Sequence, residues 1–302
     1  MMYDMVIVGA GTAGLTAAIY GVRAGKHVLL LEANTYGGQI INTPEIENYP
    51  GIKHTSGFEF ATGLYEQAME LGAQIKYEKV KTIEDLGRLK KVVTTQQEYL
   101  CNAVILATGA KNRPLGLVHE SEWIGAGVSY CATCDGNFYK GADVAVIGGG
   151  NTAFEDALFL ANICRKVYIV HRRDSFRAEK VLQDQVKNTE NIELVVNSVT
   201  KDIIGKFEVE GIKLETEGKE NDIEVQGVFV AVGTTPNSTI VKDLVKLNEY
   251  GYIVTDNNME TNIPGIFAIG DVRDTVLRQV VTACADGAIA AQSAGKYILE
   301  NK

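Results

Sequence analysis

The apolar positions of this chain fall into short runs that end in glycine-rich turns. Residues 3–8 form a β-branched and apolar run, which predicts a buried strand. Apolar residues at helical spacing follow over 15–24 and stop at Gly25, and 28–31 is a second buried run that closes at Glu32. This order of strand, helix and strand predicts a βαβ unit.

The same order recurs in the middle of the chain. Residues 143–147 and 167–170 are predicted strands on either side of a helix over 153–164. This internal repeat predicts an α/β protein with two Rossmann-like, three-layer nucleotide-binding domains. We interpret segments 111–116 and 234–238 as the two linkers that lead from the first domain to the second and back. We therefore expect the second domain, 114–238, to be inserted into a first domain made of 1–113 and 239–302.

The remaining segments fill out the two domains. Helices are expected over 58–71 and 282–299, and the stretch 36–50, rich in Gly, Asn and Pro, is expected to be irregular. Short strands at 74–79, 80–84 and 91–95 are interpreted as a β-meander, followed by a buried strand at 103–107. Further strands are expected at 192–204, 207–214, 225–232, 253–254 and 266–269.

The first glycine-rich turn has the spacing of a dinucleotide site. Gly9, Gly11 and Gly14 form G-x-G-x-x-G directly after a strand and before a helix. The first glycine permits a tight turn, the second allows a pyrophosphate to approach the backbone, and the third allows close helix packing. Glu32 stands where an acid would bind a ribose 2′-hydroxyl. The alternative is a glycine-rich turn of some other α/β fold.

The second glycine-rich turn, Gly148 to Ala153, differs at the ribose position. Gly9 to Glu32 is 23 positions, and the same count from Gly148 reaches His171. The acid is replaced there by a basic cluster, which consists of His171, Arg172, Arg173 and Arg177. Because guanidinium groups pair well with phosphate oxygens, this site is predicted to prefer NADPH over NADH. The alternative is a solvated basic surface turn.

Composition narrows the class of protein. The 302 residues carry a formal net charge of −9, which argues against general binding of nucleic acid or anionic membranes. The N-terminus has no basic segment of a signal peptide, and no apolar run approaches the ~20 residues that span a bilayer. We therefore expect a cytosolic protein.

Two of the five cysteines stand in the pattern C-x-x-C between the two nucleotide motifs. In a reducing compartment, Cys131 and Cys134 are expected to be a redox pair. Zinc is the alternative, but no second C-x-x-C exists and the four histidines show no ligand spacing near the pair. Asp135 follows directly and can move a proton when a dithiol is oxidised, or it is simply a helix N-cap or turn acid.

The other three cysteines have no partner pattern. Cys101 precedes an apolar strand, Cys164 ends a helix, and Cys284 lies at the start of an alanine-rich helix. We interpret all three as small buried hydrophobic residues.

These motifs together resemble the low-molecular-weight thioredoxin reductases, a family of flavoprotein disulfide reductases. The similarity rests on motifs in the family's order over nearly the whole chain. They are 9–14 with Glu32, 37–39, 43–51 (T-P-E-I-E-N-Y-P-G), 107–110, 131–136, 148–153, 171–178 (H-R-R-D-S-F-R-A), 270–272 and 278–287 (R-Q-V-V-T-A-C-A-D-G).

The resemblance implies FAD at the first site and NADPH at the second. The residues implied for FAD are Gly9, Gly11, Thr12, Ala13, Gly14, Glu32, Ala33, Gly38, Gln39, Asn48, Thr108, Gly109, Ala110, Gly270, Asp271, Arg278, Gln279 and Val280. Those implied for NADPH are Gly148, Gly150, Asn151, Thr152, Ala153, His171, Arg172, Arg173 and Arg177.

The resemblance also implies catalytic roles. Cys134 would face the flavin, Cys131 would attack the disulfide of thioredoxin, and Asp135 would act as acid and base. A homodimer is implied, together with a rotation of the NADPH domain about the two linkers, which would let nicotinamide and disulfide reach one flavin in turn.

One departure and two alternatives remain. The family commonly has an aromatic pair after C-D-G, whereas this chain has Asn137 and Phe138, which puts the preference for a thioredoxin partner in doubt. A relative could use another donor or acceptor, such as ferredoxin or oxygen, although the basic cluster favours NADPH. A flavin-bound redox sensor without turnover is the alternative from another class.

Overall fold

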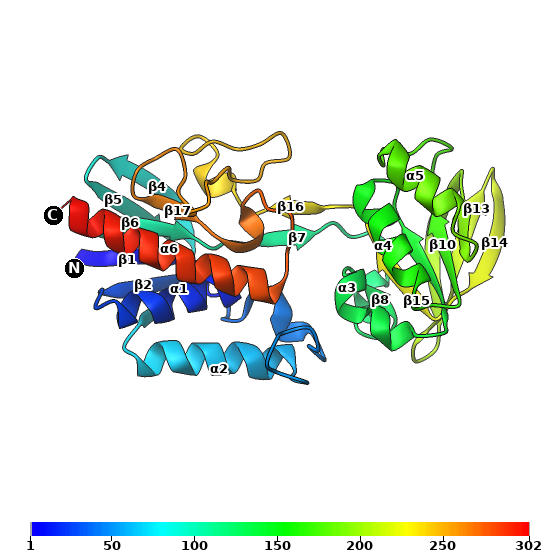
Figure 1. Ribbon diagram of the computed structural model, residues 1–302, viewed down its shortest axis with the longest axis horizontal. Coiled ribbons are helices and arrows are strands. Elements are labelled where there is room, and N and C mark those ends of the chain that lie inside the picture. Colours follow the sequence, from blue (N-terminus) through cyan, green and yellow to red (C-terminus); the bar gives the residue numbers. More distant parts are fainter. Residues whose placement is uncertain (1, 302) are drawn as a thin grey trace. The chain divides into compact units, whose positions relative to one another are not determined.

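A computed structural model describes residues 2–301 of the chain. The chain divides into two compact units. The first ends its opening segment at Lys111 and resumes at Thr235, and the second spans Asn112–Thr234. The boundaries expected from sequence were 113/114 and 238/239. Strands β7 (Ala110–Asn112) and β16 (Thr234–Pro236) pair where the chain passes between the units (Figure 1).

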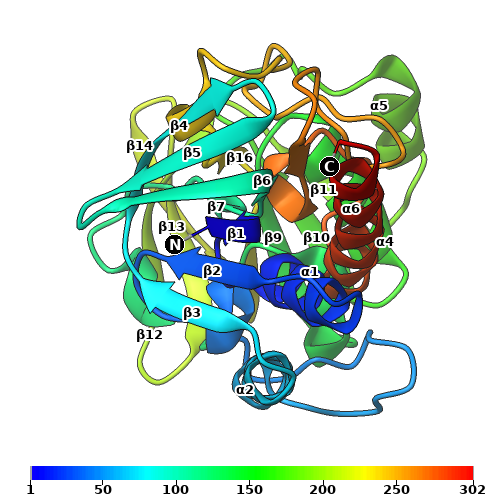
Figure 2. The same cartoon turned by 90° about the vertical axis from the view of Figure 1, so that its left-hand side faces the viewer.

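The first unit is built on a parallel sheet of five strands in the order β3-β2-β1-β6-β17. Figure 2 looks onto this unit. Its parallel strands are β1 (Met2–Val8), β2 (Val28–Glu32), β3 (Gln74–Tyr77), β6 (Glu98–Leu106) and β17 (Ile266–Ala268). Strands β4 (Val80–Leu86) and β5 (Leu89–Thr94) continue antiparallel from β6.

The first unit corrects one sequence prediction. Residues 74–79 were expected to begin the β-meander, but β3 joins the parallel sheet beside β2. Helix α2 (Gly57–Glu70) lies between these two strands in sequence and supplies the crossover that a parallel pair requires. The meander therefore consists of β4, β5 and the first half of β6.

Two helices cover one face of this sheet. Helices α1 (Thr12–Arg23) and α6 (Val280–Glu300) lie side by side (Figure 1). A Cβ on Gly287 of α6 would collide with the carbonyl oxygen of Ala13, so only small residues permit this approach. The alanine-rich faces of both helices are buried against the sheet, and this packing fixes the position of the α1 N-terminus.

The second unit repeats the arrangement. Its five-stranded sheet is parallel throughout, in the order β11-β10-β9-β15-β8. The strands are β8 (Val128–Ser129), β9 (Asp143–Ile147), β10 (Lys166–Val170), β11 (Ile192–Val195) and β15 (Gly227–Val230). An antiparallel meander accompanies it, with β12 (Ser198–Gly205), β13 (Val209–Thr216) and β14 (Lys219–Glu224). The predicted α/β fold with two Rossmann-like units is confirmed.

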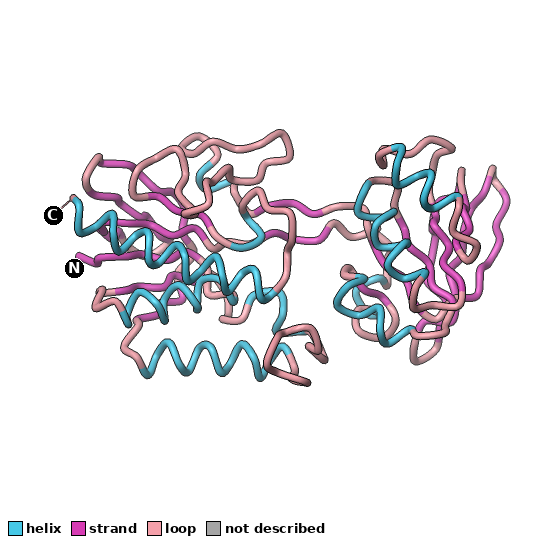
Figure 3. Tube along the Cα trace, viewed as in Figure 1, coloured by secondary structure: helices cyan, strands magenta, loops and turns pink. Residues whose placement is uncertain are grey.

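The helical segments of the second unit are short. Helices α3 (Ala132–Asp135), α4 (Asn151–Ala161) and α5 (Lys180–Lys187) pack on its sheet. The 3-10 turns of the chain are η1 (Gly38–Asn42), η2 (Glu120–Trp123), η3 (Gly136–Tyr139), η4 (Thr239–Val241) and η5 (Gly270–Val272). Figure 3 shows how much of residues 43–56, before α2, is loop.

Several expected elements have different bounds or were missed. The predicted strand 192–204 is two strands, because Asn197 adopts a left-handed backbone conformation between them. Helix α5 and strand β14 were not predicted, since their sequences are mostly polar and exposed. Residues 253–254 form only isolated bridges at Ile253, with Leu247 and Arg273. Within residues 2–301, no helix is long and apolar enough to cross a membrane.

The free cysteines differ from one another. Cys101 and Cys164 are buried, as expected, and burial raises the pKa of both thiols. Cys284 is only partly buried, so the prediction of a buried residue is wrong there. It lies on the side of α6 that meets Tyr49, and the proximity of the two groups raises the pKa of Tyr49 and lowers that of Cys284 in part.

Candidate functional site

Cys131 and Cys134 form a disulfide at the start of α3, with their Cα atoms 5.3 Å apart. Cys131 is the N-cap residue, and its carbonyl oxygen accepts hydrogen bonds from the backbone N–H groups of Cys134 and Asp135 at 3.2 and 3.1 Å. This turn of helix brings the two sulfurs together.

Asp135 is anchored beside the disulfide by a serine that sequence reasoning missed. Ser129, the last residue of β8, donates a hydrogen bond of 2.5 Å to the Asp135 carboxylate, and its Oγ accepts one of 3.0 Å from the N–H of Cys131. Burial raises the pKa of Asp135, and the Ser129 hydrogen bond partly lowers it. The carboxylate makes no capping bond to the following η3 turn, which argues against a plain N-cap.

The first glycine loop is shaped by backbone crowding. Gly9 has a positive φ of 107°, and a Cβ there would collide with the carbonyl oxygen of Ala107 at the end of β6. A Cβ on Gly14 would collide with the carbonyl oxygen of Gly9. These two approaches place the N-terminus of α1 over the carboxyl ends of β1 and β6, which is where doubly wound sheets bind nucleotides.

The residues at this N-terminus fit a dinucleotide. Helix α1 has Gly11 as its N-cap, no side-chain cap, and no acid in its first turn, which leaves its N–H groups facing outward for an anion. Glu32 accepts hydrogen bonds of 2.9 Å from the N–H groups of Ala10 and Asn34. A carboxylate has about four acceptor positions, so Glu32 can also take ribose hydroxyls.

Further predicted FAD residues converge on the same loop. Gly37 forms a bridge with Gly11, Gly38 lies against it, and a Cβ on Gly270 would lie 3.1 Å from that of Ala13. Gln39 donates a hydrogen bond to the carbonyl oxygen of Ala110. Thr108 and Asn237 exchange two hydrogen bonds of 2.8 Å, which fixes the turn that holds Gly109. Ala33 is exposed directly after Glu32.

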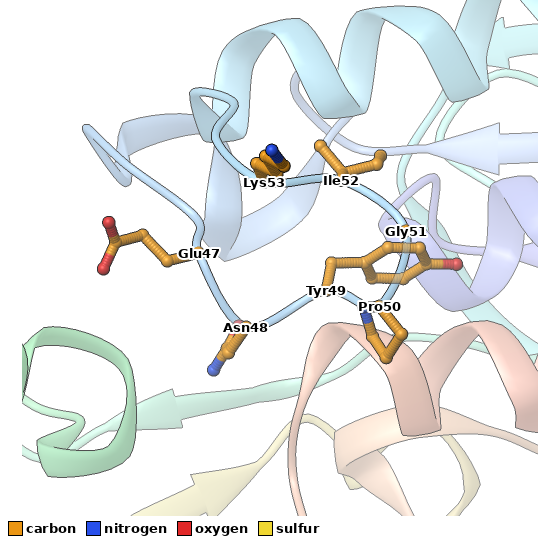
Figure 4. Close-up of a pocket in the computed structure, with 7 residues that line it drawn as sticks. All are labelled: Glu47, Asn48, Tyr49, Pro50, Gly51, Ile52 and Lys53. Carbon is orange, nitrogen blue, oxygen red and sulfur yellow. The ribbon is translucent and has the colours of Figure 1, made fainter.

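A second group of predicted FAD residues meets at the start of α6. The Asn48 amide donates a hydrogen bond of 3.1 Å to Gln279, the residue before Val280. Figure 4 shows the loop that carries Asn48, in which residues 47–53 line a pocket beside α6. The Arg278 guanidinium stacks on the ring of Tyr252, 4.1 Å from its centroid. Burial raises the pKa of Asp271, and nearby Arg278 lowers it in part.

Asp286 is another residue that sequence reasoning did not assign. It is buried in α6, accepts a hydrogen bond of 3.0 Å from the N–H of Gly270, and pairs with Arg273 at 2.7 Å. Asp286 therefore fixes the turn that holds Asp271. Its presence inside the quoted motif R-Q-V-V-T-A-C-A-D-G was the only sequence signal.

The second glycine loop has the same construction as the first. A Cβ on Gly148 would collide with the carbonyl oxygen of Ala231, as one on Gly9 would with Ala107. Gly150 is the N-cap of α4, which again has no side-chain cap and no acid in its first turn. Ala153, in the place of the third glycine, is fully buried. Thr152 is exposed beside it.

The basic cluster lies directly against this loop. The N–H groups of Arg177 and Ala178 donate to the carbonyl oxygen of Gly149 at 2.8 and 3.2 Å. The His171 ring packs so close to Gly149 that a Cβ there would collide with it. Burial lowers the pKa of His171, and a backbone contact at Ser175 raises it in part. His171, which the sequence count placed at the position equivalent to Glu32, thus lies beside the second glycine-rich turn.

The three arginines of this cluster are available to an anion. Arg172, Arg173 and Arg177 are exposed, and their charges also lower the pKa of His171. Among the described residues, none of their guanidinium groups lies within 4.0 Å of a carboxylate. The residues present therefore fit a phosphorylated nucleotide. Asn151, the first residue of α4, exchanges two side-chain hydrogen bonds with Glu179, the residue before α5.

Comparisons with known proteins agree with this construction. Residues 3–287 match the family described as pyridine nucleotide-disulphide oxidoreductase. The chain is 43% identical to the thioredoxin reductase of Listeria monocytogenes, over 100% of this chain and 95% of that protein. It is 42% identical to that of Bacillus subtilis, over 99% and 96%. The crystal structure of thioredoxin reductase from Streptococcus pyogenes matches with a TM-score of 0.95 and 44% identity, over 99% of both chains.

Two glycine-rich nucleotide loops and one redox disulfide in a single chain define a class of flavoprotein oxidoreductase. The chain belongs to this class, the pyridine nucleotide-disulphide oxidoreductases. Within it, the chain is a member of the low-molecular-weight thioredoxin reductases, as its full-length similarity to them shows. Membership implies a flavin and a nicotinamide nucleotide as cofactors.

Proposed function

We propose that this enzyme transfers two electrons from NADPH through FAD and the Cys131–Cys134 disulfide to oxidised thioredoxin. The proposal rests on three features that occur together in the second unit. This unit combines a disulfide, a partly buried acid with a raised pKa next to it, and a nucleotide loop flanked by three available arginines. When bound, FAD would supply the two-electron chemistry that links the nicotinamide nucleotide to the Cys131–Cys134 disulfide.

The chain's own residues bind the two nucleotides differently. In the first unit, Glu32 and the α1 N-terminus would hold the adenosine ribose and the pyrophosphate of FAD. In the second unit, the α4 N-terminus would hold the pyrophosphate of the nicotinamide nucleotide. The basic cluster would pair with a 2′-phosphate, which NADPH has and NADH lacks.

The reduced cysteines would then carry out thiol–disulfide exchange. Cys131 as thiolate attacks one sulfur of the thioredoxin disulfide, and a mixed disulfide forms as the other sulfur leaves as a thiol. Cys134 then attacks Cys131, which restores the enzyme disulfide and releases thioredoxin with two thiols. Asp135, held by Ser129, would give a proton to the leaving sulfur and take one from the attacking thiol. Cys134 is the sulfur expected to react with the flavin.

A trapping experiment tests this assignment. Cys134→Ser should accumulate a mixed disulfide between Cys131 and thioredoxin, whereas Cys131→Ser should form none. Thioredoxin turnover by Cys131→Ser at the rate of the unmodified enzyme would contradict the proposal.

A comparison of electron donors tests the proposed use of NADPH and of the flavin. Thioredoxin reduction should be faster with NADPH than with NADH, and rapid mixing should show NADPH bleaching the flavin absorbance before thioredoxin restores it. Turnover with reduced ferredoxin but not with NADPH would assign the enzyme to another donor. We also propose a homodimer, which light scattering on the purified holoenzyme would detect as twice the chain mass of 32.7 kDa.

A further inference from the structure

A buried carboxylate outside the site described above lies close to the disulfide in sequence. Glu120 begins the η2 turn and is only 4% exposed. Its Oε1 accepts hydrogen bonds from the Tyr130 hydroxyl at 2.6 Å and the Leu115 N–H at 2.9 Å, and its Oε2 accepts one from the Gly116 N–H at 2.9 Å. A buried carboxylate persists only when such donors satisfy it, so these contacts hold all three partners firmly.

The three donors come from two separate segments. Leu115 and Gly116 belong to the chain that leaves β7, and Tyr130 is the residue immediately before Cys131. Tyr130 packs with its ring against the core of the second unit and points its hydroxyl at Glu120. The same carboxylate therefore joins the linker segment to the segment that carries the redox disulfide.

The residue on the other side of Tyr130 is also fixed. Ser129 donates to Asp135 and accepts from the N–H of Cys131. Two adjacent residues thus anchor the chain on the N-terminal side of Cys131, one toward Asp135 and the other toward Glu120. Neither anchor depends on the bond between the sulfurs.

We propose that Glu120 is a positioning residue which, through Tyr130, keeps Cys131 beside Cys134 when the disulfide is open. The inference rests on the proposed function, in which the pair cycles between disulfide and dithiol. In the oxidised enzyme the S–S bond itself holds the sulfurs together. In the dithiol only non-covalent anchors do so, and restricting two thiols to one another raises their effective concentration and favours the disulfide.

The test is the redox equilibrium of the holoenzyme with dithiothreitol, under anaerobic conditions. Reduced dithiothreitol and the enzyme disulfide give the enzyme dithiol and oxidised dithiothreitol, so two electrons and two protons are exchanged. After acid quenching and alkylation, mass spectrometry of the peptide that contains both cysteines gives the dithiol fraction. Tyr130→Phe should shift the equilibrium constant about three- to tenfold toward the enzyme dithiol. A tenfold shift corresponds to a reduction potential of the enzyme disulfide that is about 30 mV less negative.

Two further variants make the result specific. Glu120→Gln should shift the equilibrium in the same direction, because it alters all three contacts. Tyr168→Phe is the matched control, since Tyr168 packs against the same hydrophobic cluster but lies on β10, which β9 and β15 separate from β8 in the sheet, and it should leave the equilibrium unchanged. Flavin absorbance and thermal unfolding show whether each variant folds. Tyr130→Phe keeps the ring and so remains informative if Glu120→Gln does not fold.

Three results would overturn the inference: an unchanged equilibrium in Tyr130→Phe, a shift toward the disulfide, or an equal shift in Tyr168→Phe. The measurement uses neither thioredoxin nor NADPH, so it stays valid if the substrate is another protein. An unchanged equilibrium with normal thioredoxin turnover would contradict only the role of Glu120.

Discussion

Ser129 donates a hydrogen bond of 2.5 Å to Asp135, which lies six residues further along the chain and beyond both cysteines. The bond closes a short loop around the disulfide, and the same hydroxyl accepts a hydrogen bond from the N–H of Cys131. Burial raises the pKa of Asp135, and Ser129 opposes that rise by stabilising the charged carboxylate. The serine thereby limits how far burial raises the pKa of the proposed acid and base.

Removing the Ser129 hydroxyl should therefore change a pH profile. Without this donor the pKa of Asp135 rises further, so in Ser129→Ala the limb of kcat/KM that depends on Asp135 should move to higher pH. Asp135→Asn should lose that limb and lower kcat for thioredoxin about a hundredfold, within the range of general acid–base catalysis. Thr261→Val, which removes a hydroxyl that donates to the carbonyl oxygen of Ile266 in the other unit, is the control and should keep the original profile. An unshifted limb in Ser129→Ala would contradict this role.

Nucleotide preference should depend on the basic cluster. Replacing Arg172 or Arg177 by Ala should raise KM for NADPH about 10- to 100-fold, because a charged hydrogen bond contributes roughly 1.5–3 kcal/mol, and should leave KM for NADH nearly unchanged. Arg165→Ala removes an exposed arginine of the same unit that already pairs with Asp143, so it controls for net charge. Steady-state kinetics with both nucleotides measures the effect. Equal changes for NADPH and NADH would exclude recognition of a 2′-phosphate.

Flavin binding should depend on the crowded turn of the first glycine loop. Gly9→Ala places a Cβ against the carbonyl oxygen of Ala107 in a left-handed conformation, so the loop must move and the purified protein should contain little FAD. Gly63→Ala in α2 is the control, since a Cβ there meets no atom within 4 Å apart from its own helix backbone, and alanine favours a helix. Absorbance near 450 nm relative to protein measures bound flavin. Full flavin content in Gly9→Ala would show that this approach is not required.

Stability should vary with pH through Asp156. Burial, together with the charge of Glu155, raises the pKa of Asp156 to about 7, compared with about 3.9 in an unfolded chain. Between these values the folded protein holds a proton that the unfolded chain has released, so this contribution to stability is complete below pH ~4 and is lost as the pH rises to ~7. Asparagine stays neutral throughout.

Thermal unfolding from pH 4 to pH 8 tests this expectation. The Tm advantage of Asp156→Asn over the unmodified enzyme should grow between pH 4 and pH 7 and then stay level. Glu155→Gln removes only the neighbouring charge and should give a smaller effect of the same sign. A constant difference across this range would show that Asp156 titrates normally.

Local patterns in the sequence were sufficient to predict the repeated α/β architecture and the main parts of the candidate site. Apolar runs, glycine spacing and the C-x-x-C pair predicted both nucleotide loops, the repeat and the disulfide, because each depends on residues close together in the chain. The count from Gly148 to His171 worked for the same reason, since a βαβ unit of constant length returns the chain to the same edge of the sheet. Elements with polar sequences, such as α5 and β14, gave no periodic signal and were missed.

Contacts between distant segments were decided only by the tertiary structure. Strand β3 paired with β2 rather than with the meander, because a helix crossover brought it to the open edge of the parallel sheet. Asp286 accepts a hydrogen bond from Gly270, and Glu120 accepts one from Tyr130, because buried polar groups need hydrogen-bond partners. Hydrophobic periodicity indicates which face of an element is buried. It does not indicate which buried polar groups form hydrogen bonds with each other, so these contacts could be identified only from the tertiary structure.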